Sequence, residues 1–258
     1  MSFDLHHTFQ DLMKVKADVL CGYHIISAEP EARTHIQVDY FCIADLDRPY
    51  TGPEQGIRPL DNFTHYNVIE LEGLGRILSE GRLRYHIGRT LVMENPDAKP
   101  SRQGQISLTI LTVHTPEKLL GSGKYSFKEV ASWKYQTSVL GDLPVTIIVL
   151  RELQKVDAGE AAAWLQLLEP DPKRRPAVWA KILDQNFTSR ERIKSTMIKI
   201  DEEAFMTIAE EFRVEGREER AIEIARNMVR MGSDPSFILK VTGLTQEQIA
   251  QIKQTKDR

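Results

Sequence analysis

Four segments in the first 155 residues show the alternation or the apolar runs of β-strands. Residues 34–45 (THIQVDYFCIAD) and 67–73 (NVIELEG) are rich in β-branched and aromatic residues and alternate in character along the chain. Residues 105–116 (QISLTILTVHTP) are almost entirely apolar or β-branched, which is typical of a strand buried on both faces of a sheet. Residues 143–153 (LPVTIIVLREL) complete the set, so the pattern predicts four strands.

Helical spacing of apolar residues appears before and between the expected strands. The first 20 residues are mildly amphipathic, and residues 76–94 are expected to form a helix that stops before an Asn-Pro pair. Residues 45–66 hold three prolines and two glycines, which predicts a long loop. Residues 127–138 (FKEVASWKYQTS) fit either a helix or irregular structure.

The pattern changes after the fourth expected strand, where alanine, leucine, glutamate and lysine dominate. Helices are expected over residues 158–170, 176–187 and 190–230. Two short helices close the chain. Asp234 before Pro235 begins the first of them, and Gly243 ends it. Thr245 and Gln248 form a capping box for the second.

The predicted fold class is therefore α/β, with a mixed central sheet flanked by helices and followed by an all-helical tail. We expect an α/β domain over residues 1–155 and a helical region over residues 156–258 that ends in the short helix pair. A chain of 258 residues is long enough to bury a substantial core in such a domain.

Composition and charge narrow the class of protein without identifying it. Hydrophobic residues at 41% and charged residues at 28% are ordinary values for a globular protein in water. The formal net charge of −3 provides no global attraction to nucleic acid, so a polyanion site has to be a local patch. Cys21 and Cys42 lack metal-binding spacing and indicate a reducing, cytoplasmic setting. The N-terminus lacks the features of a signal peptide, and no apolar run reaches the roughly 20 residues of a membrane span.

Two glutamates stand two positions apart in the second expected strand. Alternation places Glu70 and Glu72 on one face of that strand and Asp39 on one face of the first strand. If the strands are neighbours with Asp39 near Glu70, three carboxylates meet, and they repel one another unless a cation lies among them. Such oxygen ligands suit Mg²⁺ or Mn²⁺. The other interpretation, which this common spacing favours, is a half-exposed hairpin whose polar side chains face water.

A helix with several basic residues follows these glutamates. Arg82 and Arg89 fall on one helical face, and Tyr85 or His86 lies between them. Arg82, Arg84 and Arg89 would bind phosphates, while Tyr85 would add a stacking surface. The simpler explanation is a solvated basic face on a surface helix, and the spacing leaves both open.

The order of these elements is similar to the core of the PD-(D/E)XK nuclease superfamily. The stretches IQVDYF, NVIELEG and SEGRLRYHIGRTLV resemble the aspartate strand, the Glu-X-(Lys/Gln) strand and the basic helix of its transposase-associated, recombination-promoting branch. The tail EGREERAIEIARNMVRMGSDPSFILKVTGLTQEQIAQIK resembles the ending of such proteins. Together these stretches cover about half of the chain.

The resemblance implies a metal-dependent DNA endonuclease, a phosphodiester hydrolase that uses Mg²⁺. Carried over to this chain, it makes Asp39 and Glu70 the metal ligands and Glu72 the third catalytic position. The residues that it places against DNA are Arg82, Arg84, Tyr85 and Arg89.

Glu72 departs from the family pattern, which has lysine or glutamine at that position. A glutamate cannot donate a charge-assisted hydrogen bond to a developing negative charge. Three outcomes are open. Glu72 is an extra metal ligand, or a cation such as Arg76 or Arg82 reaches the site from elsewhere, or the site is inactive.

A non-enzymatic class therefore stands beside the endonuclease: a nuclease-fold protein that binds DNA or a protein partner without cutting. A third class is an oligomeric scaffold built on the helical tail. The amphipathic helix over residues 215–231 would join two protomers in a homodimer. Residues 235–253 resemble a helix-turn-helix, but the second helix carries little positive charge at its N-terminal end. We therefore favour packing or oligomerisation for this pair, with DNA reading as the alternative.

Overall fold

The computed structural model describes residues 4–27, 38–54, 56–73, 76–93, 106–140, 142–157, 159–230 and 234–254. The chain divides into two compact units, Met1–Glu202 and Glu203–Arg258. Each unit has a hydrophobic core of its own.

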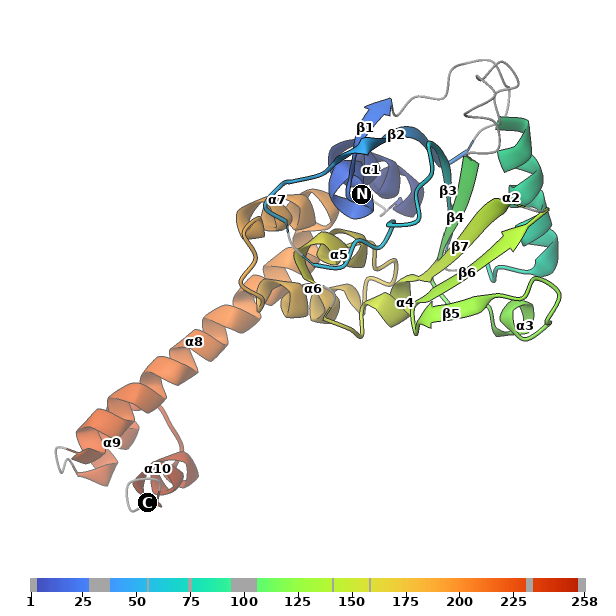
Figure 1. The fold of residues 1–258 in the computed structure, drawn as a ribbon. Coiled ribbons are helices and arrows are strands. Elements are labelled where there is room, and N and C mark those ends of the chain that lie inside the picture. The colour runs from blue at the N-terminus through green and yellow to red at the C-terminus, as the bar shows by residue number, and fades with distance from the viewer. Residues whose placement is uncertain are drawn as a thin grey trace. The chain divides into compact units, whose positions relative to one another are not determined.

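The first unit contains a mixed sheet whose described strands follow the order β1-β2-β3-β4-β7-β6-β5 (Figure 1). The strands are β1 (Tyr23–Ser27), β2 (Tyr40–Pro49), β3 (Tyr66–Glu72), β4 (Ile106–Thr112), β5 (Lys128–Ala131), β6 (Lys134–Val139) and β7 (Leu143–Val149). β3, β4 and β7 run parallel at the centre, and the outer strands pair antiparallel. β4 is buried at every position, as its apolar sequence predicts. The predicted fold class, α/β with a helical tail, is confirmed.

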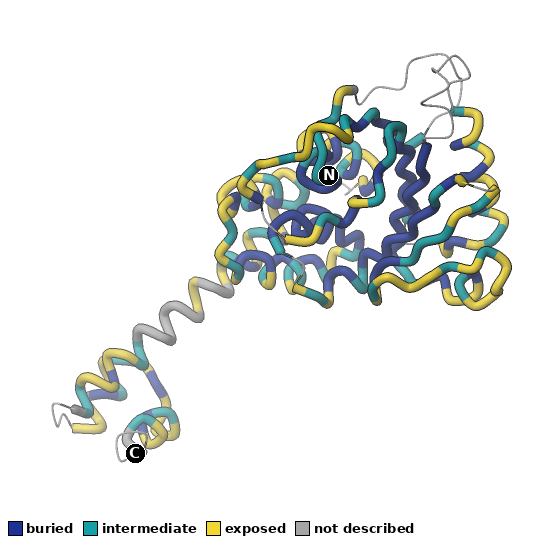
Figure 2. Tube along the Cα trace, in the orientation of Figure 1, coloured by how far each residue is buried: buried dark blue, intermediate teal, exposed yellow. Residues whose placement is uncertain are grey.

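Helices cover both faces of this sheet. The described helices of the first unit are α1 (Leu5–Cys21), α2 (Glu80–Met93), α3 (Glu117–Leu120), α4 (Leu150–Leu153), α5 (Gly159–Gln166), α6 (Arg175–Leu183) and α7 (Arg190–Ile200). On one face, Leu83 of α2 shares a core with Val68 of β3 and Ile110 of β4. On the other face, the hydroxyl of Tyr40 donates to the carbonyl of Met13 in α1 (3.4 Å). The central strands are consequently dark blue, the colour of buried residues, in Figure 2. Each large apolar side chain buried in this way stabilises the fold by about 1.5–3 kcal/mol.

Four sequence-based assignments in this unit are wrong. The helix expected over residues 190–230 is interrupted, because α7 ends at Ile200. Residues 127–138, expected as helix or irregular structure, form the β5–β6 hairpin because β6 completes its hydrogen bonds on β7. Residues 45–49, expected as loop, continue β2 because β1 pairs with that end of the strand. β7 ends at Val149, and α4 replaces the last residues of the expected fourth strand. Residues 34–37 of the first expected strand lie outside the described residues.

The expected domain boundary at residue 155 falls where the strands end, whereas the compact units divide after Glu202. The reason is that α5 contacts α1 as well as α6. Trp164 of α5 and Trp179 of α6 are both buried. The helices from α5 to α7 therefore belong to the first unit.

The second unit is built from α8 (Glu202–Arg230), α9 (Pro235–Thr242) and α10 (Gln246–Gln254). Ala225 of α8, Ile238 of α9 and Ile249 of α10 are buried in one cluster. The apolar stripe of α8 that includes Ala225 thus packs on the short helices of the same chain. The homodimer expected from this helix stays a prediction.

Local capping signals set the ends of the two short helices, as the sequence predicts. Asp234 Oδ1 accepts the Ser236 N–H (2.8 Å) before α9, and Gly243 ends that helix with a φ of +71°. Thr245 N–H donates to Gln248 Oε1 (2.8 Å), and Gln248 N–H donates to Thr245 Oγ1 (3.2 Å). The capping box that begins α10 is therefore confirmed.

Candidate functional site

The strands that carry the three predicted carboxylates are neighbours. β2 and β3 pair antiparallel, with Tyr40 opposite Ile69 and Phe41 opposite Val68. Asp39 comes directly before Tyr40, so the same register continues to a position opposite Glu70. The strand pairing expected from the sequence is present.

Glu70 and Glu72 point into the protein, toward α2. Their residues are 2% and 0% exposed, respectively. The alternative of a half-exposed hairpin with these glutamates in water is therefore wrong. A buried carboxylate is costly unless a cation or hydrogen-bond donors compensate it, so the partners of these two side chains define the site.

Glu72 is held by two side chains from α2. Arg82 donates from Nε and Nη2 to Glu72 Oε1, at 2.9 and 2.6 Å. His86 Nε2 lies 2.6 Å from the same oxygen. Burial alone would raise the pKa of Glu72, but the hydrogen bonds from His86 and Arg82 hold it below the ordinary value. Arg82, one of the two cations that the sequence analysis named for this position, thus reaches Glu72, and a catalytic role for either residue stays a prediction.

Glu70 faces the same helix one turn further along. Its Oε1 lies 3.6 Å from His86 Nδ1 and 3.4 Å from Arg89 Nη1, which are ion-pair rather than hydrogen-bond distances. Glu70 Oε1, Glu72 Oε2 and His86 Nδ1 are buried without a hydrogen-bond partner. Although burial opposes it, the two carboxylates raise the pKa of His86, which favours its charged form.

Asp39 has partners of a different kind. Its Oδ2 accepts the backbone N–H of Leu71 (2.7 Å) and so extends the hydrogen bonding of β3 beyond the end of the β2 ladder. His6 Nδ1 of α1 lies 3.3 Å from Asp39 Oδ1. Asp39 is the most accessible of the three carboxylates, with a side chain 23% exposed.

This arrangement does not fit a divalent cation as it stands. Across the described part of the chain, no three His, Cys, Asp or Glu side chains form a group that could hold a metal ion. Arg82, His86 and Arg89 already neutralise Glu70 and Glu72, and their charges would repel Mg²⁺ or Mn²⁺. The predicted metal ligation therefore stays a prediction.

The four residues predicted to face DNA divide into two pairs. Arg84 and Tyr85 lie on the outer side of α2, where the Tyr85 residue is 53% exposed and Arg84 pairs with Glu80 (2.8 Å). Arg82 and Arg89 turn toward the sheet glutamates, but their guanidinium carbons also lie 5.7 and 5.2 Å from the centroid of the Tyr85 ring. The outer face of α2 therefore presents an exposed aromatic ring with the guanidinium groups of two arginines near it.

From the sequence alone, no role in the site is assigned to His86. It joins both glutamates, and it stands four positions after Arg82 on the buried side of α2, which also holds Leu83 and Ile87. That spacing was the available signal, because two polar residues at i and i+4 on an otherwise apolar face need a buried partner.

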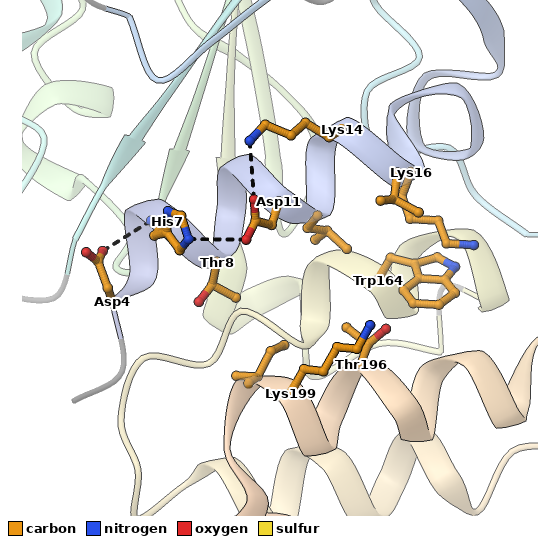
Figure 3. A pocket seen from close by; sticks show the side chains of 12 residues that line it. Asp4, His7, Thr8, Asp11, Lys14, Lys16, Trp164, Thr196 and Lys199 are labelled. Atoms are coloured by element: carbon orange, nitrogen blue, oxygen red, sulfur yellow. Dashed lines mark hydrogen bonds and ion pairs between the residues drawn. The ribbon is translucent and has the colours of Figure 1, made fainter. Parts of the chain in front are cut away.

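A pocket of about 560 Å³ lies between α1, α5 and α7 (Figure 3). Three of its charged groups pair with one another, since His7 and Lys14 each lie 3.3 Å from Asp11. Lys16 is buried with its ammonium group 3.9 Å from the centroid of the Trp164 ring. None of the described residues that line this pocket belongs to the carboxylate network.

Comparison with known proteins identifies the C-terminal part of the chain. Residues 218–254 match a family model described as the C-terminal HTH domain of the Rpn/YhgA-like nuclease family. No curated protein and no solved structure matches this chain. The match supports a relationship to that nuclease family, and it covers α9, α10 and the second half of α8. No helix in the described ranges is long and apolar enough to cross a membrane.

Proposed function

We propose that this protein binds DNA, using the C-terminal helix-turn-helix and the outer face of α2, and that an internal ion-pair network stands in place of a catalytic metal site. The observation that carries the proposal is the burial of Glu72 with Arg82 at 2.6 Å and His86 at 2.6 Å. The match to the C-terminal HTH domain of a nuclease family supports DNA as the partner.

The network argues against hydrolysis for two reasons. A Mg²⁺ ion in a nuclease keeps several water ligands, whereas Glu70 and Glu72 are almost completely shielded from solvent. In addition, a cation that assists the reaction has to face the phosphate, whereas the Nε and Nη2 atoms of Arg82 both donate to Glu72.

The outer face of α2 offers the groups that a nucleic-acid backbone needs. Arg84 is exposed and pairs with Glu80, and the guanidinium groups of Arg82 and Arg89 lie near the Tyr85 ring. Guanidinium groups bind phosphate oxygens, and an exposed aromatic ring stacks on an unpaired base or packs on a sugar. Arg82 and Arg89 pair with Glu72 and Glu70, so the exposed Arg84 is the phosphate contact that this surface offers.

Duplex binding measured by fluorescence anisotropy at two salt concentrations tests this part of the proposal. Arg84→Ala is expected to weaken binding and to reduce the salt slope by about one, because one phosphate contact is lost. Arg190→Ala on α7 is the matched control, since it removes an equally exposed arginine from another surface. Equal effects of the two substitutions, or no binding by the folded wild-type chain, would refute this role for α2.

A second candidate function is the metal-dependent DNA endonuclease, with Mg²⁺ or Mn²⁺ held by Asp39 and Glu70. The register that places Asp39 opposite Glu70 favours it. Nicking of supercoiled plasmid with Mg²⁺, with Mn²⁺ and with EDTA distinguishes the two functions. Metal-dependent nicking that is lost in Asp39→Ala and Glu70→Ala would establish the endonuclease. No nicking by folded protein with either metal is the result that our proposal expects.

A further inference from the structure

The orientation of α10 is fixed by its apolar residues. Ile249 is buried in the core of the second unit with Leu244, and Ile252 packs against the same core. The opposite side of the helix is exposed along its first two turns. The exposed residues on that side are Gln246, Glu247, Ala250 and Gln251.

Two of these exposed residues, Gln246 and Glu247, stand in the first turn of α10. The next residue, Gln248, forms the capping box with Thr245. Its side chain therefore stabilises the start of the helix. Gln246 and Glu247 have no such structural role among the described contacts. In a helix-turn-helix, the first residues of the second helix are those that meet base edges in the major groove.

Building on the proposed function, we infer that Gln246 and Glu247 select the DNA sequence, with Gln246 reading adenine and Glu247 reading cytosine. A glutamine amide donates to adenine N7 and accepts from adenine N6, and a glutamate carboxylate accepts from cytosine N4. The methyl group of Ala250, one turn further along on the same side, suits contact with the methyl group of thymine.

The charge of residues 218–254 favours a role in reading bases over a role in attracting DNA phosphates. Residues 218–254 contain five Lys or Arg and five Asp or Glu. Asp234 caps α9, and Glu247 lies in the first turn of α10, so neither helix start is a strong phosphate site. Phosphate contacts position a protein, whereas base contacts specify the sequence. We therefore assign base selection, and not phosphate attraction, to α10.

Selection of binding sites from a randomised duplex pool by the full-length chain tests the inference. The wild-type protein is expected to enrich sites with adenine and cytosine at fixed positions. Glu247→Gln is expected to replace cytosine by adenine at one position and to change the affinity ratio between the two sites by about 5- to 100-fold. Gln246→Ala is expected to remove the preference at the other position.

Glu223→Gln on α8 is the control, because it removes the same charge from an exposed position in the same unit. Circular dichroism of each variant establishes that it is folded. An unchanged motif in Glu247→Gln, or a wild-type protein that binds DNA without sequence preference, would overturn the inference and leave the proposed function standing. Absence of any DNA binding by the wild-type chain would overturn both.

Discussion

His86 Nε2 of α2 lies 2.6 Å from Glu72 Oε1 of β3, and both residues are buried. The same carboxylate oxygen accepts two hydrogen bonds from Arg82. This contact joins the helix that carries the basic face to the strand that carries the paired glutamates.

Glu72→Ala is expected to destabilise the first unit strongly. The substitution leaves His86 and the inner part of Arg82 without their anion, and breaking a buried pair in this way costs about 3–5 kcal/mol. Urea denaturation followed by circular dichroism measures the change. Glu80→Ala, which removes the surface partner of Arg84 and Lys124, is the control and is expected to cost much less. Similar losses in the two variants would show that the buried network contributes little.

The free energy of unfolding is expected to decrease at both acidic and alkaline pH. The pKa of His86 is raised, so its contribution is complete below the unfolded pKa of about 6.5 and is lost as pH rises through the folded pKa. The pKa of Glu72 is lowered, so its contribution is present above the unfolded pKa of about 4.3 and is lost as pH falls through the folded pKa. Unfolding free energies measured from pH 9 down to well below pH 4 check both limbs. His86→Gln should lack the alkaline limb, and its persistence would exclude His86 as the cause.

Gly88→Ala is expected to stabilise the protein. Gly88 is exposed in the middle of α2, and nothing lies within 4 Å of an added Cβ. Alanine is better than glycine in a helix interior by about 0.5–1 kcal/mol. Gly22→Ala should have the opposite effect because Gly22 has a φ of +82°. Thermal unfolding of the two variants gives the signs, and a lower melting temperature for Gly88→Ala would contradict the exposed position of this face.

Lys16 and Glu54 form a second buried ion pair, with Lys16 Nζ donating to Glu54 Oε1 (3.0 Å). Lys16→Met leaves the Glu54 carboxylate buried with Arg192 at 3.7 Å and the Tyr50 hydroxyl at 2.6 Å. We expect a loss of about 3 kcal/mol, and the double variant Lys16→Met/Glu54→Leu should recover part of it. A double-mutant cycle in urea measures the coupling. A double variant less stable than Lys16→Met would show that the carboxylate has sufficient partners without Lys16.

Local sequence patterns were sufficient to predict several elements of the fold. The capping box of Thr245 and Gln248 and the end of α9 at Gly243 depend on neighbours within four residues, so their sequence signals were sufficient. The buried strand β4 followed in the same way from a run of mostly apolar and β-branched residues. The β5–β6 hairpin did not, because its strands are mostly polar and their hydrogen bonds depend on β7.

The sequence by itself also determined that Glu70 and Glu72 share one face of a strand, since side chains alternate along any strand. Only the tertiary structure decided that this face is buried and that Arg82 and His86, 10 and 14 residues further along the chain, occupy it. The physical reason is that a carboxylate on a strand is equally compatible with water, a metal ion or a guanidinium group. The helix that packs over β3 selects among these partners, and its position depends on the whole core.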